Sequence, residues 1–319
     1  MILGLISNLH SRGNRRQPPE LPAVGGSKVK LLHRTLEGVS GMEEALGDLA
    51  AEGAEVVAVN GGDGSVSAVL TGLLENSPFE RTPALAVLSG GTLNMTSADV
   101  GLKGSVGAAL GRLATRVAEP EWDHGALERD VLRVSYDPGK MPVCGMFFGT
   151  AVIYRAVVLT CERMQPLGLG PSTAAFATLV YLLGRHWIKG GGEDDLVRGD
   201  EMAVRLDGGP GQRVTQLLAL VTTLDRLVLG SRPFWGQEQG ALHYTGIAYP
   251  THRLLRSALR VLYGGAERRL PPSHYVSHNV DRVAFEMDCS FTLDGELYTP
   301  ASGTPVEVGS GGRVKFVQC

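Results

Sequence analysis

The sequence predicts an α/β fold with two domains: an N-terminal domain with a helix-covered parallel sheet, and a C-terminal domain that is mostly an antiparallel β-sandwich. Apolar runs of strand length alternate with helix-length segments through about residue 118, and this alternation is typical of a parallel sheet. After Asp123 the pattern changes to short apolar runs rich in β-branched residues. Two N-terminal strands also end in glycine-rich turns, which favour ligand sites at the edge of such a sheet.

The N-terminal domain is expected to span residues 1–123. The run that ends at Asn60 is its clearest strand, because it is apolar, rich in valine and stops abruptly at a cluster of glycines. The other elements are predicted in the same way, from short apolar runs for strands and from apolar residues at helical spacing for helices. The expected strands are 2–7, 28–33, 55–60 and 84–88, and the expected helices are 41–52, 65–75 and 105–117.

The second domain is expected to span residues 124–319. Its apolar runs predict strands of a mostly antiparallel sandwich, with a helical insertion over 172–188. We expect its last strand to return toward the first domain. The expected strands are 131–136, 202–206, 216–223 and 282–287.

Composition narrows the class of protein. The chain has 319 residues, 43% of them hydrophobic, which is enough for two domains with buried cores. A formal net charge of −3 argues against a basic groove for nucleic acid. The four cysteines are scattered without a close pair, and the N-terminus lacks an export leader. A cytoplasmic protein is therefore expected, and peripheral, transient contact with a membrane surface stays compatible with the sequence.

The first glycine-rich turn follows the strand 55–60. Asn60 is succeeded by Gly61, Gly62, Asp63 and Gly64, and Ser65 then opens an apolar helical pattern. Glycines permit positive φ and a close backbone approach, and the N–H groups at a helix start favour phosphate. The alternative is an ordinary connection between a strand and a helix, since these residues are common turn formers.

Asp63 adds a carboxylate to this turn. Such a group holds Mg²⁺ through water or accepts a proton from a hydroxyl. The turn therefore favours phosphoryl transfer over passive binding.

A second turn follows the strand 84–88. Gly90 and Gly91 precede Thr92 and Asn94, whose side chains would hydrogen-bond phosphate or the nucleoside, or else cap a helix. Because neighbouring parallel strands end at the same edge of a sheet, both turns are expected to converge on one ligand.

These two turns, together with Asp294-Gly295-Glu296 late in the chain, resemble the diacylglycerol kinase and sphingosine kinase superfamily, and in particular its soluble bacterial lipid kinases. The resemblance implies ATP and Mg²⁺ as cofactors and a lipid hydroxyl, such as that of diacylglycerol, as acceptor. It also implies that nucleotide lies between the two domains and that the Asp294-to-Glu296 turn supplies the general base.

Other positions match the family partly. Asn8 and Ser11 lie where the resemblance implies a phosphate loop after the first strand, although Leu9 and Arg12 depart from its pattern. Met95 replaces the usual aspartate of the second turn.

Two further acidic residues are candidates: one in a loop of the second domain and one at the expected domain boundary. The resemblance also implies a secondary Mg²⁺ site in the second domain, but Gln239 stands where its acidic ligand is expected, so Glu238 would have to take that place. Asp123 would be either a buried hydrogen-bond hub at the domain junction or a plain surface acid.

Three alternatives to a lipid kinase remain from the sequence. A NAD kinase shares the first turn, but no Asn-Glu pair occurs near the second one. A nucleotide or lipid sensor of the same fold would lack turnover. A dinucleotide-dependent dehydrogenase is disfavoured because no G-x-G-x-x-G follows a strand. The apolar stretch 164–188 would line an acyl pocket or belong to the core.

Overall fold

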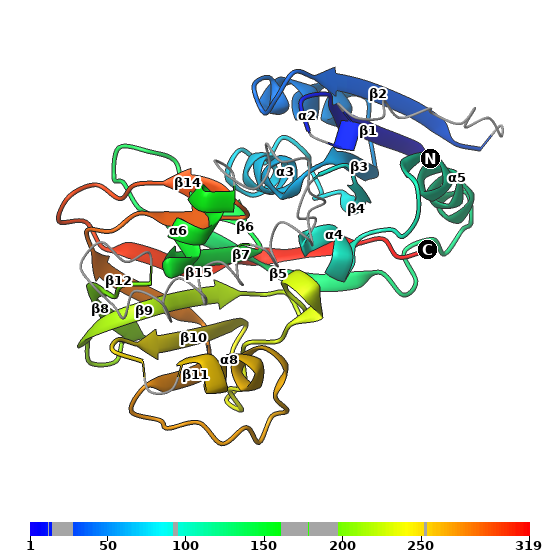
Figure 1. Cartoon of the computed structure of the whole chain (residues 1–319). Helices are drawn as coiled ribbons and strands as arrows, with labels where there is room; N and C mark the ends of the chain where they lie inside the picture. The colour runs from blue at the N-terminus through cyan, green and yellow to red at the C-terminus, as the bar shows by residue number, and fades with distance from the viewer. Residues whose placement is uncertain (12, 15–27, 92–94, 161–177, 179–196, 252–253) are drawn as a thin grey trace. The chain divides into compact units, whose positions relative to one another are not determined.

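The structure, a computed structural model, divides into two compact units (Figure 1). Unit 1 comprises Met1–Val131, Val143–Gly145 and Gly311–Cys319, and unit 2 comprises Leu132–Pro142 and Met146–Ser310. The described residues are 1–11, 13–14, 28–91, 95–160, 178, 197–251 and 254–319.

Unit 1 is built on a parallel sheet. β1 (Ile2–Asn8) lies between β2 (Lys30–Leu36) and β3 (Val56–Gly61), and β3 continues to β4 (Ala84–Ser89). Phe316, near the C-terminus, pairs with Leu85 of β4 in parallel as well. β3 is buried along its whole length, which explains why its sequence is apolar without alternation.

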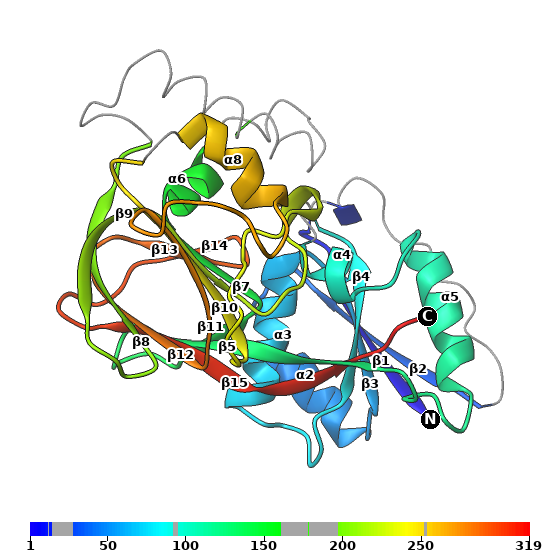
Figure 2. The same cartoon turned by 90° about the horizontal axis from the view of Figure 1, so that it is seen from below.

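Helices cover both faces of this sheet (Figure 2). The side chain of Leu49 in α2 (Met42–Ala51) lies directly over Gly4 of β1, and Leu46 contacts α3 (Asp63–Glu75) at Gly72. On the other face, α5 (Val106–Val117) packs its buried apolar stripe against β1, β3 and β4. The short helix α4 (Met95–Val100) follows the second glycine turn. β5 (Leu127–Ser135) and β6 (Val143–Gly145) come after α5.

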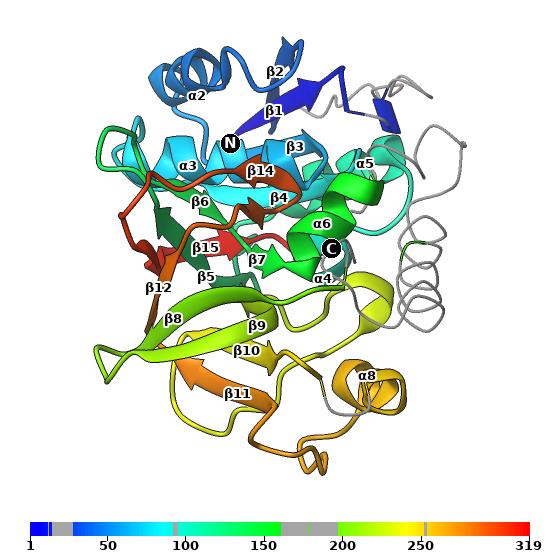
Figure 3. The same ribbon diagram turned by 60° about the vertical axis from the view of Figure 1, so that its left-hand side comes forward.

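Unit 2 is antiparallel throughout its recorded pairings. Its strands are hydrogen-bonded in the order β14-β13-β7-β9-β8-β12-β15, and β10 pairs with β9 on one side and β11 on the other (Figure 3). The strands are β7 (Phe147–Ala151), β8 (Asp200–Leu206), β9 (Gln212–Thr222), β10 (Leu242–Ala248), β11 (Tyr275–Val280), β12 (Arg282–Met287), β13 (Phe291–Leu293), β14 (Glu296–Tyr298) and β15 (Val306–Phe316).

Two apolar groups hold unit 2 together. Phe148 stacks on Phe285 with ring centroids 5.2 Å apart, and Phe291 lies 5.0 Å from Phe148. On another face of the sheet, α6 (Val152–Leu159) and α8 (Leu254–Tyr263) pack against β9, β10 and β11. A short 3₁₀ turn, η2 (Val228–Gly230), lies between β9 and β10 in the chain.

The structure confirms the predicted fold class of a parallel N-terminal sheet followed by an antiparallel β-rich part. The expected strands and helices of unit 1 match the observed ones closely. The first segment of unit 1 ends at Val131, whereas we expected the division at residue 123. The helices α4, α6 and α8 were not predicted. The expected insertion at 172–188 lies outside the described residues. No helix within the described ranges combines the length and apolarity of a bilayer-crossing segment.

Phe291 is fully buried in the aromatic group, whereas Leu297 on the neighbouring strand β14 is 46% exposed. We predict that Phe291→Ala lowers the free energy of unfolding by about 3–5 kcal/mol, because it removes a packed ring and leaves a cavity. Leu297→Ala should change it by less than about 0.5 kcal/mol. Urea unfolding followed by circular dichroism measures both, and equal losses for the two variants would contradict the assigned core.

Candidate functional site

The two glycine turns lie side by side in unit 1. Gly61, the last residue of β3, is the register partner of Ser89, the last residue of β4. A Cβ on Gly62 would stand 3.3 Å from the Cα of Gly91. The backbones of the two turns are therefore in contact at the carboxyl edge of the sheet, where open α/β sheets bind ligands.

This contact depends on missing side chains. A Cβ on Gly90 would lie 2.4 Å from Asn60 Oδ1 and 2.9 Å from the backbone nitrogen of Gly61, and one on Gly61 would lie 2.5 Å from Ser65 Oγ. Of the two properties expected of these glycines, the close backbone approach is used and the positive φ is not. Gly62 has φ −89°, and Gly61 and Gly64 lie in β3 and α3. Space for the neighbouring backbone is what requires glycine here.

The segment after β1 ties both turns together. Asn8 donates from Nδ2 to Ser65 Oγ at 2.9 Å, while its Oδ1 accepts the N–H groups of His10 and Gly38 at 2.9 and 3.2 Å. Ser11 Oγ donates to the carbonyl oxygen of Gly90 at 2.8 Å. Asn8 and Ser11, the two residues predicted for a phosphate loop, are therefore buried, and their side chains hydrogen-bond to the two turns.

Asn14 belongs to this network although the sequence analysis did not select it. Its Nδ2 donates to the carbonyl oxygens of Asn8 at 2.8 Å and Asn60 at 3.2 Å, and the residue is 4% exposed. Its only sequence signal was an asparagine close behind the first strand. Asn60 itself is fully buried beneath Gly90, so it supports the second turn.

Asp63 connects the first turn to the start of α4. Its Oδ2 accepts the N–H of Met95 at 3.1 Å and its Oδ1 accepts the N–H of Thr96 at 2.9 Å. The residue is 7% exposed. A carboxylate at a helix start receives orphan N–H donors and is favoured by the helix dipole. Asp63 therefore binds the start of α4 to the first turn.

A half-buried histidine, His33, lies on β2, the strand that pairs with β1. His33 Nε2 lies 3.0 Å from Ser7 Oγ, and Asn60 Nδ2 donates to the same hydroxyl at 3.4 Å. Burial lowers the pKa of His33, which favours the neutral form of the imidazole.

Thr92 and Asn94, the polar residues predicted for the second turn, lie outside the described residues, as does Arg12. Within the described part, Gly91 makes the backbone contact with Gly62, and Ser65 lies in the first turn of α3. These two residues and Gly62 and Gly64 surround the start of α3.

Asp294 and Gly295 form the two-residue turn between β13 and β14 in unit 2. Their φ values are 51° and 88°, the left-handed pair that such a hairpin needs and that Asp-Gly favours. Asp294 is 4% exposed, and its oxygens accept the N–H groups of Met146 and Phe147, each at 2.9 Å. Glu296 is exposed at the start of β14. The two carboxylates thus have different environments.

Glu238 pairs with a histidine. Its Oε1 lies 2.7 Å from His278 Nδ1 and its Oε2 accepts the N–H of Asn279 at 3.1 Å. The hydrogen bond with His278 is the main reason that the pKa of Glu238 falls to about 2. Among the described residues, no three histidine, cysteine or acidic side chains gather in a group that could hold a metal ion.

Asp123 is exposed and forms an ion pair with Lys315, with the nitrogen and oxygen 3.3 Å apart. The surface alternative is therefore correct and the buried hub is wrong. An exposed pair of this kind contributes little to stability.

Comparison with known families bears on unit 1. Residues 25–121 match the model of the diacylglycerol kinase catalytic domain. This part of the chain is similar to that domain. The match contains both glycine turns and Asp63, and it confirms the resemblance predicted from the sequence. It does not extend to Asn8, Ser11 or the Asp294 turn.

Solved structures show the same fold. A crystal structure described as a diacylglycerol kinase from Bacillus anthracis strain Sterne is 14% identical, with a TM-score of 0.59, and covers 99% of this chain and 96% of its own. A second structure from that strain, described as a proposed diacylglycerol kinase, is 15% identical with a TM-score of 0.62 and equal coverage. At these identities the likeness establishes the fold alone. No curated protein sequence matches this chain.

The contact between the turns gives a stability prediction. Gly90→Ala should lower the free energy of unfolding by about 1–3 kcal/mol, because the new methyl group overlaps Asn60 and Gly61. Gly47→Ala is the matched control, since its Cβ would meet nothing within 4 Å in α2. It should stabilise the protein by about 0.5–1 kcal/mol. Urea unfolding measures both variants. If Gly90→Ala is as stable as Gly47→Ala, the close contact between the two turns is not required for the fold.

Proposed function

We propose that this protein is an ATP- and Mg²⁺-dependent lipid kinase that phosphorylates the hydroxyl of diacylglycerol or a related long-chain lipid. The similarity of residues 25–121 to the diacylglycerol kinase catalytic domain supports a kinase-like family. The observation that carries the proposal is the backbone contact between Gly62 and Gly91, which joins two glycine turns at the carboxyl edge of a parallel sheet.

This arrangement fits a nucleotide. The start of α3 supplies backbone N–H donors that lack a helical acceptor, and such donors favour phosphate. Asp63 would hold a Mg²⁺ ion through its water shell, since both of its oxygens already accept backbone N–H groups. The ion would neutralise the charge of the phosphates when bound.

The general base is assigned to the turn in unit 2. Asp294 is buried, and its oxygens accept two backbone N–H groups. Its part is to hold the turn. Glu296 is exposed and is the carboxylate to which the acceptor hydroxyl would give its proton.

The lipid acceptor is proposed from the family. The domain model that matches residues 25–121 is that of diacylglycerol kinases, and the similar solved structure from Bacillus anthracis is described as a diacylglycerol kinase. The apolar stretch proposed for an acyl chain, 164–188, lies almost entirely outside the described residues.

The first functional test is transfer of labelled γ-phosphate from ATP and Mg²⁺ to diacylglycerol, monoacylglycerol, sphingosine, ceramide, phosphatidylglycerol and NAD. We expect label in one lipid. Glu296→Gln should lower the rate by roughly a hundredfold or more, because the base is removed. Its melting temperature should not change, since the side chain is exposed.

Glu201→Gln is the control, because Glu201 is also an exposed acid of unit 2, on β8. It should keep the full rate. Asp294→Asn, measured with its melting temperature, separates the two acids. A folded Asp294→Asn protein that loses more activity than Glu296→Gln would move the base to Asp294. If only NAD is labelled, the protein is a NAD kinase and the lipid-kinase proposal is wrong. If ATP binds but no acceptor is labelled, a sensor of the same fold is favoured.

A lipid kinase must reach its substrate at a membrane surface, and α8 offers a suitable face. Leu259 is 71% exposed, Tyr263 is 52% exposed, and the Tyr263 hydroxyl donates to the carbonyl oxygen of Leu229, which is 43% exposed. Arg256 and Arg260 are exposed on the same helix, which contains no acidic residue. Exposed apolar residues beside arginines favour an anionic membrane surface. We therefore propose that this face makes transient membrane contact.

Sedimentation with vesicles tests this contact. We expect more binding to vesicles of phosphatidylcholine with phosphatidylglycerol than to phosphatidylcholine alone. Leu259→Glu should weaken binding by roughly tenfold or more, as expected when a leucine can no longer enter the membrane. Val39→Glu is the control, because Val39 is 51% exposed in unit 1. Equal binding of the two variants would refute the assignment of α8.

A further inference from the structure

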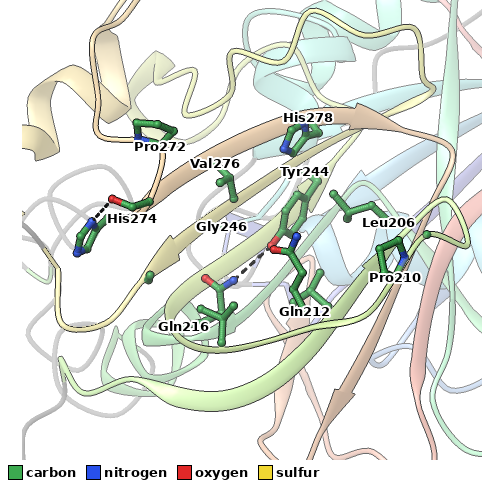
Figure 4. A pocket seen from close by; sticks show the side chains of 15 residues that line it. Leu206, Pro210, Gln212, Gln216, Tyr244, Gly246, Pro272, His274, Val276 and His278 are labelled. Atoms are coloured by element: carbon green, nitrogen blue, oxygen red, sulfur yellow. Dashed lines mark hydrogen bonds between the residues drawn. The ribbon is translucent and has the colours of Figure 1, made fainter.

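Unit 2 contains a cavity of about 380 Å³ on the face of its sheet that α6 and α8 leave uncovered (Figure 4). Strand residues alternate between the two faces. Leu217, Ile247 and Tyr275 belong to the apolar group packed against α6 and α8. Their neighbours Gln216, Gly246 and Val276 line the cavity instead. The volume lies within the range of small-molecule sites.

The inner end of the cavity is polar and buried. Gln216 is 4% exposed, and its Nε2 donates to the hydroxyl of Tyr244 at 3.4 Å (Figure 4). Among the described residues, Gln216 Oε1 has no hydrogen-bond partner. A buried acceptor without a donor is unfavourable, so a ligand that supplies the donor gains affinity there.

Gly246 makes room for this pair. A Cβ on Gly246 would lie 2.5 Å from the Tyr244 hydroxyl oxygen, 3.1 Å from Gln216 Nε2 and 3.2 Å from Gln216 Oε1. Any larger residue would displace both polar groups. The amide and the phenol are therefore built into the floor of the cavity.

The walls determine the rest of the ligand. Apolar side chains dominate the walls, and among the described residues the only ionisable side chains that line the cavity are those of Tyr244, His274 and His278. One of the lining histidines, His278 on β11, is already paired with Glu238. A charged ligand would lose its hydration without gaining a partner. The apolar wall residues are Val204, Leu206, Val214, Val276, Ala248 and Pro272.

We propose that this cavity binds a neutral alcohol with an apolar chain. The hydroxyl donates to Gln216 Oε1 and accepts the hydrogen of the Tyr244 hydroxyl, and the chain lies along the apolar walls. A hydroxyl matches the floor because it both donates and accepts. The site contains none of the glycine-turn residues and none of the Asp294 turn, so it stands independently of the proposed kinase activity.

Calorimetric titration with 1-octanol and its isomer 1-methoxyheptane tests the proposal on the full chain. The ether has the same atoms but no O–H donor. We expect 1-octanol to bind at least about tenfold more tightly, as one hydrogen bond to a buried acceptor allows. Gln216→Met should lose this preference and weaken 1-octanol binding about tenfold. Gln237→Met is the matched control, because Gln237 is exposed outside the cavity, and it should bind as the unaltered protein does.

Val276→Phe provides a second variant that fills the cavity and leaves the amide in place. It should abolish binding of both compounds, and its melting temperature shows whether unit 2 still folds. The proposal is overturned if 1-octanol and the ether bind equally, if neither binds, or if Gln216→Met and Gln237→Met behave alike. Because binding is measured directly, the result does not depend on whether the protein phosphorylates a lipid.

Discussion

The contact between two side-chain-free backbones is the constraint on which the arrangement of unit 1 depends. Gly90 lies directly over Asn60 and Gly61 at distances that leave no room for a Cβ, and Gly62 lies close beside Gly91. Once these backbones meet, Ser11 can bind the carbonyl oxygen of Gly90. Three chain segments that are distant in the sequence then form one edge of the sheet, where α3 begins.

Buried carboxylates perform similar structural work in both units. Asp63 accepts the N–H groups of Met95 and Thr96, and Asp294 accepts those of Met146 and Phe147. In each case two backbone donors compensate the cost of burying a charge and join segments that are remote in the chain. The motifs that suggested chemistry therefore first hold the fold, and Glu296 is the exposed acid of the late turn.

The sheet of unit 2 uses its two faces differently. One face buries Leu217, Ile247 and Tyr275 under helices. The other keeps Gln216 and Tyr244 at the floor of a cavity because Gly246 has no side chain. As in unit 1, a glycine is selected here by the space that its neighbours occupy, and its conformational freedom is not needed.

The sequence by itself determined the parallel unit 1, its strand ends, the two glycine turns and the Asp-Gly hairpin, because periodicity and turn chemistry act over a few residues. It did not determine which groups these residues contact. The partners of Asp63 lie 32 and 33 residues away and those of Asp294 lie 147 and 148 away. For the same reason the sequence did not decide between the two alternatives for Asp123, and it did not indicate Asn14 or the cavity beside Gln216. Only tertiary packing decides which carboxylate is buried against backbone donors and which glycine makes room for a neighbour, since both depend on segments that the local pattern does not bring together.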